Sequence, residues 1–174
     1  GHSMGGLVAT SLAAEPDMPV TGLILSSTHL GFSLPSGEPL MPRYATRIER
    51  LETKGSNLEY GLERARRNTP DGTSDAVVSF LANIALDIRL EQIRDGGRMS
   101  QEADNAAFSN RIKVPVLILS GGKDTVISDE MHNALTSAFP VAEQIVFPDA
   151  GHASYAECPE IYHSEIIKFV NKTD

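Results

Sequence analysis

The chain has 174 residues, of which 41% are hydrophobic and 22% charged, a composition typical of one ordinary globular domain. This excludes a disordered tail, a collagen-like repeat and a coiled coil, and no run approaches the roughly 20 apolar residues that a membrane span needs. Fifteen Lys and Arg against 23 Asp and Glu give a net charge of −8, which argues against a nucleic-acid partner bound through neutralised phosphates. The single cysteine, Cys158, excludes an internal disulfide framework and favours a reducing, cytoplasmic location.

The sequence begins at Gly1, without an initiator methionine and in the middle of what looks like a functional motif. We therefore expect it to be the C-terminal fragment of a longer protein. On that expectation, the absence of a signal peptide carries no information about targeting.

Helices and short apolar strands alternate at both ends of the chain, a pattern typical of an α/β fold with a parallel sheet. A helix is predicted over 4–14 because apolar residues recur there at helical spacing. One face of it carries Met4, Leu7, Val8 and Leu12. Strands are predicted over 20–27, 114–120 and 144–147, and the first is apolar on both faces, as in a buried parallel strand. Further helices are predicted after Ser128 and over about 159–170.

The segment 29–110 differs from the rest, because it opens with a loop rich in Pro, Gly and Ser and then becomes helical and charged. Its apolar spacing predicts three or four helices and no strand. The first is expected to stop at Gly55, and the last, which carries a firm apolar stripe, to end at Gly96–Gly97. The chain thus divides into a core region at 1–28, an inserted helical cap at 29–110 and a second core region at 111–174.

The first five residues, Gly-His-Ser-Met-Gly, fit the pattern G-x-S-x-G. In that motif a strand turns sharply into a helix, and glycines on either side of the serine remove side chains that would clash at the turn. The hydroxyl of Ser3 would then project into a cleft, and the N–H of Met4 would be one donor to an oxyanion. The alternative is that Ser3 is an ordinary helix cap.

A serine hydroxyl needs a base within hydrogen-bond reach, and the base needs an orienting acid. Among the five histidines, His152 stands out, because it lies in a loop between the last strand and the last helix, at the edge where sites in parallel sheets collect. Asp124 follows the strand 114–120 in the same way, and Asp149 remains a second candidate for the acid. The alternative is that these are ordinary loop and turn residues. The order Ser3, Asp124, His152 is the chain order of an α/β-hydrolase triad.

Other polar residues carry weaker signals. His2 is expected to have a packing role. Arg64, Arg66 and Arg67 could hold a substrate carboxylate, although a solvated helix face with acidic neighbours is the favoured interpretation. No His, Cys or Glu cluster has metal-ligand spacing, and no phosphate loop or dinucleotide fingerprint follows a strand, so neither a metal nor a cofactor is expected.

On the residues GHSMGG, VPVLILSGGKD and the DAGH loop, the chain resembles the C-terminal part of an α/β-hydrolase-fold serine hydrolase, from Gly1 to about Val170. It is most similar to 3-oxoadipate enol-lactonases and related carboxylesterases or C–C bond hydrolases. The resemblance implies that Ser3 is the nucleophile, His152 the general base and Asp124 its partner, beneath a helical cap. A serine at the elbow, in place of an aspartate, argues against dehalogenase or epoxide-hydrolase chemistry.

Such proteins carry five strands before the elbow and take their second oxyanion donor from that part, so we expect this piece alone to be poorly stable and inactive. The strand over 20–27 would present an unpaired apolar edge. We expect the whole protein to be a serine hydrolase acting on a small ester or lactone through an acyl-enzyme, with no nucleic-acid or membrane partner. The alternatives are a non-catalytic binding protein on the same fold, and an acyltransferase or C–C hydrolase that uses the same residues.

Overall fold

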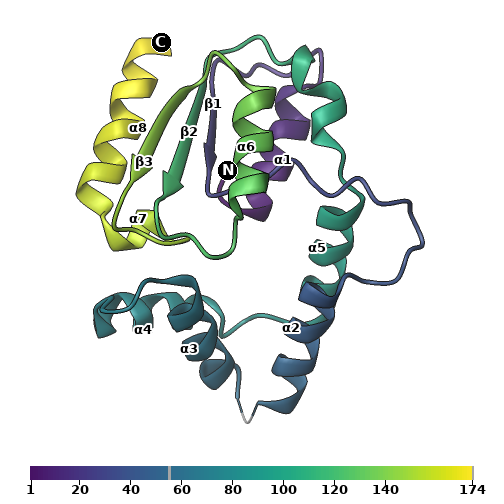
Figure 1. Cartoon of the computed structure of the whole chain (residues 1–174), viewed down its shortest axis with the longest axis vertical. Helices are drawn as coiled ribbons and strands as arrows, with labels where there is room; N and C mark the ends of the chain where they lie inside the picture. Colours follow the sequence, from purple (N-terminus) through teal and green to yellow (C-terminus); the bar gives the residue numbers. More distant parts are fainter. Residues whose placement is uncertain (55, 174) are drawn as a thin grey trace.

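A computed structural model describes residues 1–54 and 56–173. Its centre is a parallel sheet with the strand order β1-β2-β3 (Figure 1). The strands are β1 (Leu23–Ser26), β2 (Val116–Gly121) and β3 (Glu143–Phe147). Leu25 lies opposite Ile118 in the pairing of β1 with β2, and Leu119 lies opposite Ile145 in that of β2 with β3. The predicted parallel sheet is confirmed, although the strand expected over 20–27 is only four residues long.

Helices cover both faces of this sheet. One face packs against α1 (Met4–Ala13), the 3-10 helix η1 (Asn105–Arg111) and α6 (Asp129–Ala138), and the other packs against α7 (Ser154–Glu157) and α8 (Pro159–Thr173). Side chains alternate along β2 as strand geometry requires: Val116 and Ile118 join the first layer, and Leu117 and Leu119 the second. Because both faces are covered, β2 is apolar on both faces from Val116 to Leu119.

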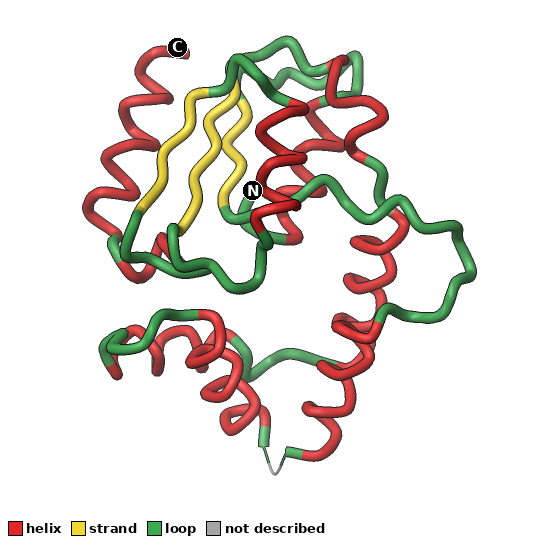
Figure 2. The backbone as a smooth tube through the Cα atoms, in the orientation of Figure 1, coloured by secondary structure: helices red, strands yellow, loops and turns green. Residues whose placement is uncertain are grey.

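Within the described residues, four helices lie beyond the carboxyl ends of the strands (Figure 1). They are α2 (Pro42–Thr53), α3 (Asn57–Asn68), α4 (Asp75–Ile84) and α5 (Leu90–Glu102). Ser56 caps α3 and Ser74 caps α4, each by accepting a hydrogen bond from an N–H in the first turn. The long loop from β1 to α2 runs past the end of α5 (Figure 2), where the N–H of Phe32 donates to the carbonyl of Ser100.

The predicted helix end at Gly96–Gly97 is wrong, because α5 runs through both glycines. A Cβ at Gly97 would lie 2.7 Å from the ring of Tyr44, and one at Gly96 would lie 2.6 Å from the sulfur of Met4. These glycines therefore let α5 approach its neighbours closely, a use of glycine that outweighs its low helix propensity. Gly55, the other predicted helix end, lies outside the described residues.

The buried face of α1 also differs from the sequence pattern. Leu7 is 1% exposed, whereas Met4, Val8 and Leu12 are 46–53% exposed. The buried residues of α1 are Gly6, Leu7 and Thr10. Among the described residues, no helix combines the length and the apolar character needed to cross a bilayer.

Candidate active site

Ser3 stands at a strained turn between the edge of β1 and the start of α1. Its backbone angles are φ 51° and ψ −123°, a conformation that side-chain-bearing residues rarely adopt. The N–H of Ser3 donates to the carbonyl of Ser26, and the N–H of Ser26 donates to the carbonyl of Gly1, both at 2.9 Å. These bonds fasten the turn to the sheet.

Of the two glycines in the G-x-S-x-G motif, only Gly1 acts as the pattern predicts. A Cβ at Gly1 would collide with the backbone of Gly5, so Gly1 has the steric role expected. At Gly5 itself a Cβ would meet nothing within 4 Å, which shows that the expected clash there is wrong. Gly6 takes that place instead, because a Cβ there would collide with the side chain of Thr28.

The three residues singled out in the sequence lie in one hydrogen-bonded row. The Oγ of Ser3 is 3.0 Å from Nε2 of His152, and Nδ1 of His152 is 2.8 Å from Oδ2 of Asp124. The side chains of His152 and Asp124 are only 5% and 6% exposed. Because the carboxylate accepts from Nδ1–H, Nε2 is left as the acceptor for the serine hydroxyl.

The other oxygen of Asp124 is also fully engaged. Its Oδ1 accepts from the N–H of Val126 at 2.7 Å and from the N–H of Ile127 at 3.1 Å. Burial by itself raises the pKa of Asp124, but the bond from His152 and these two N–H groups outweigh it, so the pKa lies below its ordinary value. The carboxylate is therefore charged at neutral pH.

The second candidate for the acid, Asp149, lies elsewhere. Its carboxylate is 89% exposed and pairs with the ammonium group of Lys123 at 2.8 Å. This bond lowers the pKa of Asp149. Of the two aspartates, only Asp124 contacts His152.

His2 supports the loop that carries His152. Its Nε2 lies 2.8 Å from the backbone oxygen of His152, and its ring packs 4.9 Å from the His152 ring and 5.0 Å from that of Tyr155. Burial lowers the pKa of His2 to about 4, so the ring is neutral near pH 7 and Nε2–H is the donor. These contacts agree with the packing role expected for His2.

The N–H of Met4 is the first of α1 and has no intrahelical acceptor. Within the described part of the chain, no other acceptor is paired with it. A free N–H at a helix N-terminus favours negative charge, and this one belongs to the residue after Ser3.

A cavity of about 400 Å³ opens beside Ser3, between the sheet edge and the helices α2, α3 and α5. Its apolar wall consists of Met4, Ile88, Ile93, Val126 and Ile127, with Tyr44 and Tyr60. Its polar wall includes His29, Arg43, Arg47, Arg64 and Ser100. This is the size and mixture of surfaces typical of a small-molecule site.

His29 was not expected at the site. It is buried, its Nδ1 accepts from the N–H of Gly31 at 3.0 Å, and its Nε2 lies 3.3 Å from Oγ of Ser100. The hydroxyl of Tyr44 donates to the same Oγ at 2.7 Å. Burial lowers the pKa of His29 to about 4, so it is neutral at pH 7. Its position directly after an apolar strand, like that of Asp124, was the available sequence signal.

A parallel sheet between two helical layers, with a serine at a strained strand-to-helix turn and a histidine and an acid beyond later strands, defines the α/β-hydrolase fold. The chain belongs to the Hydrolase_4 family, described as serine aminopeptidase, S33, which matches residues 1–159. The predicted fold and resemblance are therefore confirmed.

The chain is also similar in sequence and in structure to individual known proteins. The chain is 26% identical over 176 residues to a pimeloyl-[acyl-carrier protein] methyl ester esterase of Neisseria meningitidis, a match that covers 98% of this chain and 55% of that protein. Among solved structures, it resembles the enol-lactonase from Burkholderia xenovorans LB400 with a TM-score of 0.79 and 20% identity, covering 98% of this chain and 64% of that one. A malate-bound thermophilic esterase from Thermogutta terrifontis gives a TM-score of 0.80 and 25% identity, covering 99% and 64%. The chain thus spans little more than half of the length of the Neisseria esterase.

Proposed function

We propose that this chain carries the reaction centre of a serine hydrolase that acts on a small ester or lactone. The observation that carries the proposal is the row of contacts from Ser3 Oγ to His152 Nε2 at 3.0 Å and from His152 Nδ1 to Asp124 at 2.8 Å. These distances lie within the range of a working nucleophile and base. Relatives named as an esterase and an enol-lactonase support an ester or lactone as the substrate class.

The reaction begins when Oγ of Ser3 bonds to the acyl carbon and its proton passes to Nε2 of His152. The carbonyl oxygen becomes an oxyanion, to which the N–H of Met4 donates. As the tetrahedral centre collapses, His152 gives the proton to the leaving oxygen and the acyl group stays on Ser3. His152 then takes a proton from water, whose oxygen attacks the acyl carbon. When this second tetrahedral centre collapses, its bond to Oγ of Ser3 breaks, Oγ takes the proton back from Nε2 of His152, and the acid is released.

Asp124 has two tasks in this scheme. It keeps the proton of neutral His152 on Nδ1, and its charge stabilises the imidazolium that forms when Nε2 accepts the second proton. The N–H groups of Val126 and Ile127 hold the carboxylate in place while it does so.

The helices α2 to α5, which lie within the segment 29–110, act as a cap that selects the substrate over a core made of 1–28 and 111–174, whereas η1 packs on the sheet with the core. Support comes from the cavity beside Ser3, whose walls include Tyr44 of α2, Tyr60 of α3 and Ile93 of α5. An acyl group on Ser3 would lie among these side chains. Exclusion of water there strengthens the electrostatic interactions of the site.

A fluorophosphonate probe, which reacts with activated serines, tests the proposal on the natural protein that contains this sequence. We expect stoichiometric labelling at Ser3, none in Ser3→Ala and at least 100-fold slower labelling in His152→Ala. Ser36→Ala, at an exposed loop serine, is the control and keeps the normal rate. Failure to label Ser3 when a control hydrolase is labelled, or equal labelling of Ser3→Ala, would overturn the proposal.

A further inference from the structure

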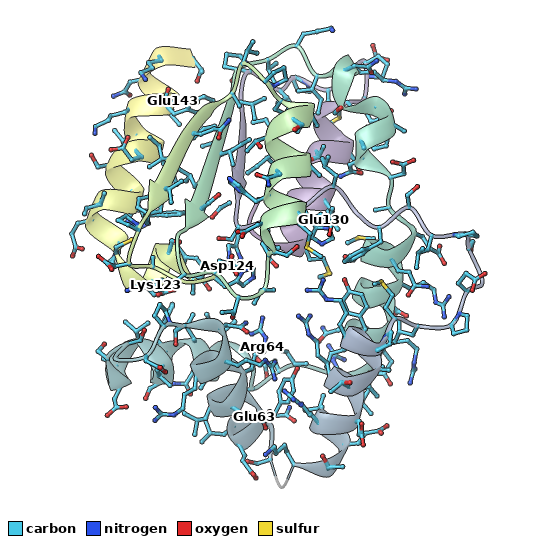
Figure 3. All side chains as sticks on the ribbon, in the orientation of Figure 1. Glu63, Arg64, Lys123, Asp124, Glu130 and Glu143 are labelled. Carbon is cyan, nitrogen blue, oxygen red and sulfur yellow. The ribbon has the colours of Figure 1, made fainter. Side chains whose placement is uncertain are left out.

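Three arginines converge on the cavity beside Ser3. Arg43 and Arg47 come from α2 and Arg64 from α3, and all three are only partly exposed. Figure 3 shows Arg64 on the side of α3 that faces the core. We call these residues the arginine cluster. Their neighbours Arg66 and Arg67 are exposed, so the three arginines of α3 have different surroundings.

The arginine cluster has no carboxylate partner within the described residues, since none of the ion pairs there includes its members. The acid beside Arg64 in sequence, Glu63, pairs instead with Arg50 at 3.0 Å, Lys54 at 2.9 Å and Arg67 at 3.5 Å. In a protein with 23 acidic residues and a net charge of −8, an unneutralised group of cations is a local exception.

Aromatic rings and one carbonyl hold part of the cluster in position. The guanidinium of Arg43 lies 5.4 Å from the ring of Phe32 and 5.7 Å from that of Tyr44, and it donates to the carbonyl of Val126 at 3.3 Å. Arg47 lies 5.5 Å from the Tyr44 ring. Stacking of this kind orients a guanidinium without using its N–H groups, of which each arginine has five.

The three charges also repel one another. Burial lowers the pKa of Arg47, and repulsion from Arg43 and Arg64 lowers it further. Cations held together in a partly buried cavity raise the free energy of the empty site, and a bound anion removes that penalty. Low-dielectric walls also focus the positive potential within a molecule that is negative overall.

We propose that the arginine cluster binds a carboxylate at the far end of the substrate, so that the preferred substrates are monoesters or lactones of dicarboxylic acids. Guanidinium groups match a carboxylate in planar, two-pronged geometry. The apolar side chains of Ile88 and Ile93 line the same cavity and suit the hydrocarbon spacer between the carboxylate and the reacting carbonyl. This inference rests on the proposed function, because it specifies the substrate of that same site.

Two substrates with the same six-carbon acyl chain test the proposal on the natural protein: mono-(4-nitrophenyl) adipate, which has a free carboxylate, and its methyl ester, which is neutral. We expect kcat/KM for the acid to exceed that for the neutral ester by at least tenfold. Arg64→Gln should lower kcat/KM for the acid by 10- to 100-fold, a loss at least tenfold larger than the one it causes on the neutral ester. Arg64→Lys should recover part of the loss, and Arg66→Gln, on the exposed side of the same helix, should change neither value. Retained hydrolysis of the neutral ester shows that each variant is folded.

Calorimetry with adipate on Ser3→Ala separates this proposal from the proposed function. We expect adipate to bind Ser3→Ala, and at least tenfold more weakly when Arg64→Gln is added. Hydrolysis of the neutral ester without any preference for the acid, or equal losses on both substrates in Arg64→Gln, would overturn the carboxylate site and leave the hydrolase intact. Adipate binding that depends on Arg64, with no hydrolysis of either ester, would support the carboxylate site and overturn the hydrolase.

Discussion

Asp124→Asn is the sharpest test of the hydrogen-bonded row. The amide keeps the shape of the carboxylate, and its oxygen can still accept from the N–H groups of Val126 and Ile127. Its NH₂ then occupies the place of Oδ2 and points donors at Nδ1 of His152, 2.8 Å away. Because the side chain at position 124 is only 6% exposed, water cannot readily replace the carboxylate as the acceptor for Nδ1–H of His152. His152 must therefore carry its proton on Nε2, where it cannot accept the proton of Ser3.

We expect kcat/KM for 4-nitrophenyl acetate to fall by about 10⁴-fold in Asp124→Asn, the order found for the wrong histidine tautomer in serine proteases. That loss corresponds to about 5.5 kcal/mol of transition-state stabilisation. Stopped-assay rates near pH 8 and a thermal unfolding curve would be measured together, so that loss of fold is separated from loss of chemistry. Asp149→Asn, which breaks only the exposed pair with Lys123, should change the rate by less than twofold. A fall of less than tenfold in Asp124→Asn would refute the reasoning.

Two further predictions concern stability. Gly97→Ala should lower the free energy of unfolding by about 1–3 kcal/mol in urea titrations, because its Cβ would lie 2.7 Å from the Tyr44 ring. Gly5→Ala, with open space around its Cβ, is the control and should not destabilise the protein. Equal effects of the two substitutions would contradict the packing argument. For His29, the folded pKa of about 4 lies below the ordinary 6.5, so the unfolded chain binds the proton first and stability falls as pH drops from 6.5 to 4. At pH 5 His29 lowers the free energy of unfolding by about 2 kcal/mol relative to neutral pH. In His29→Gln the decrease in unfolding free energy between pH 7 and pH 5 should be smaller by that amount. An unchanged pH dependence would argue against a neutral buried His29.

The proximity of Ser3, Asp124 and His152 could be predicted from the sequence, because the prediction needed only the order of strands and helices along the chain. Carboxyl ends of parallel strands share one edge of a sheet, so residues that follow different strands meet there whatever the details of packing. The choice between Asp124 and Asp149 needed coordinates, because both lie in polar loops near that edge. Only the placement of their carboxylates separates a contact with His152 from one with Lys123.

The arginine cluster could not be found in this way. Arg43 and Arg47 are four residues apart and so share a face of α2, but a charged helix does not reveal which face turns toward a cavity. That orientation depends on Tyr44 packing against Gly97 of α5, a contact between segments more than 50 residues apart. The same contact explains why Gly96–Gly97 resembles a helix end in the sequence. Helix propensity depends on the residue and its near neighbours in sequence, so it does not include a packing partner that is distant along the chain.

The direction of the Ser3 hydroxyl is in turn set by the sheet. A residue held at φ 51° costs about 1–3 kcal/mol, and it persists only if its surroundings hold it there. Here two of the restraints come from the carboxyl end of β1: the carbonyl of Ser26 accepts from the N–H of Ser3, and the hydroxyl of Thr28 donates to the carbonyl of Ser3 at 2.6 Å. Gly6 allows Thr28 to come this close. The turn is therefore built by a strand that follows it in sequence, which is why the position of Ser3 depends on the folded core and not on the G-x-S-x-G motif alone.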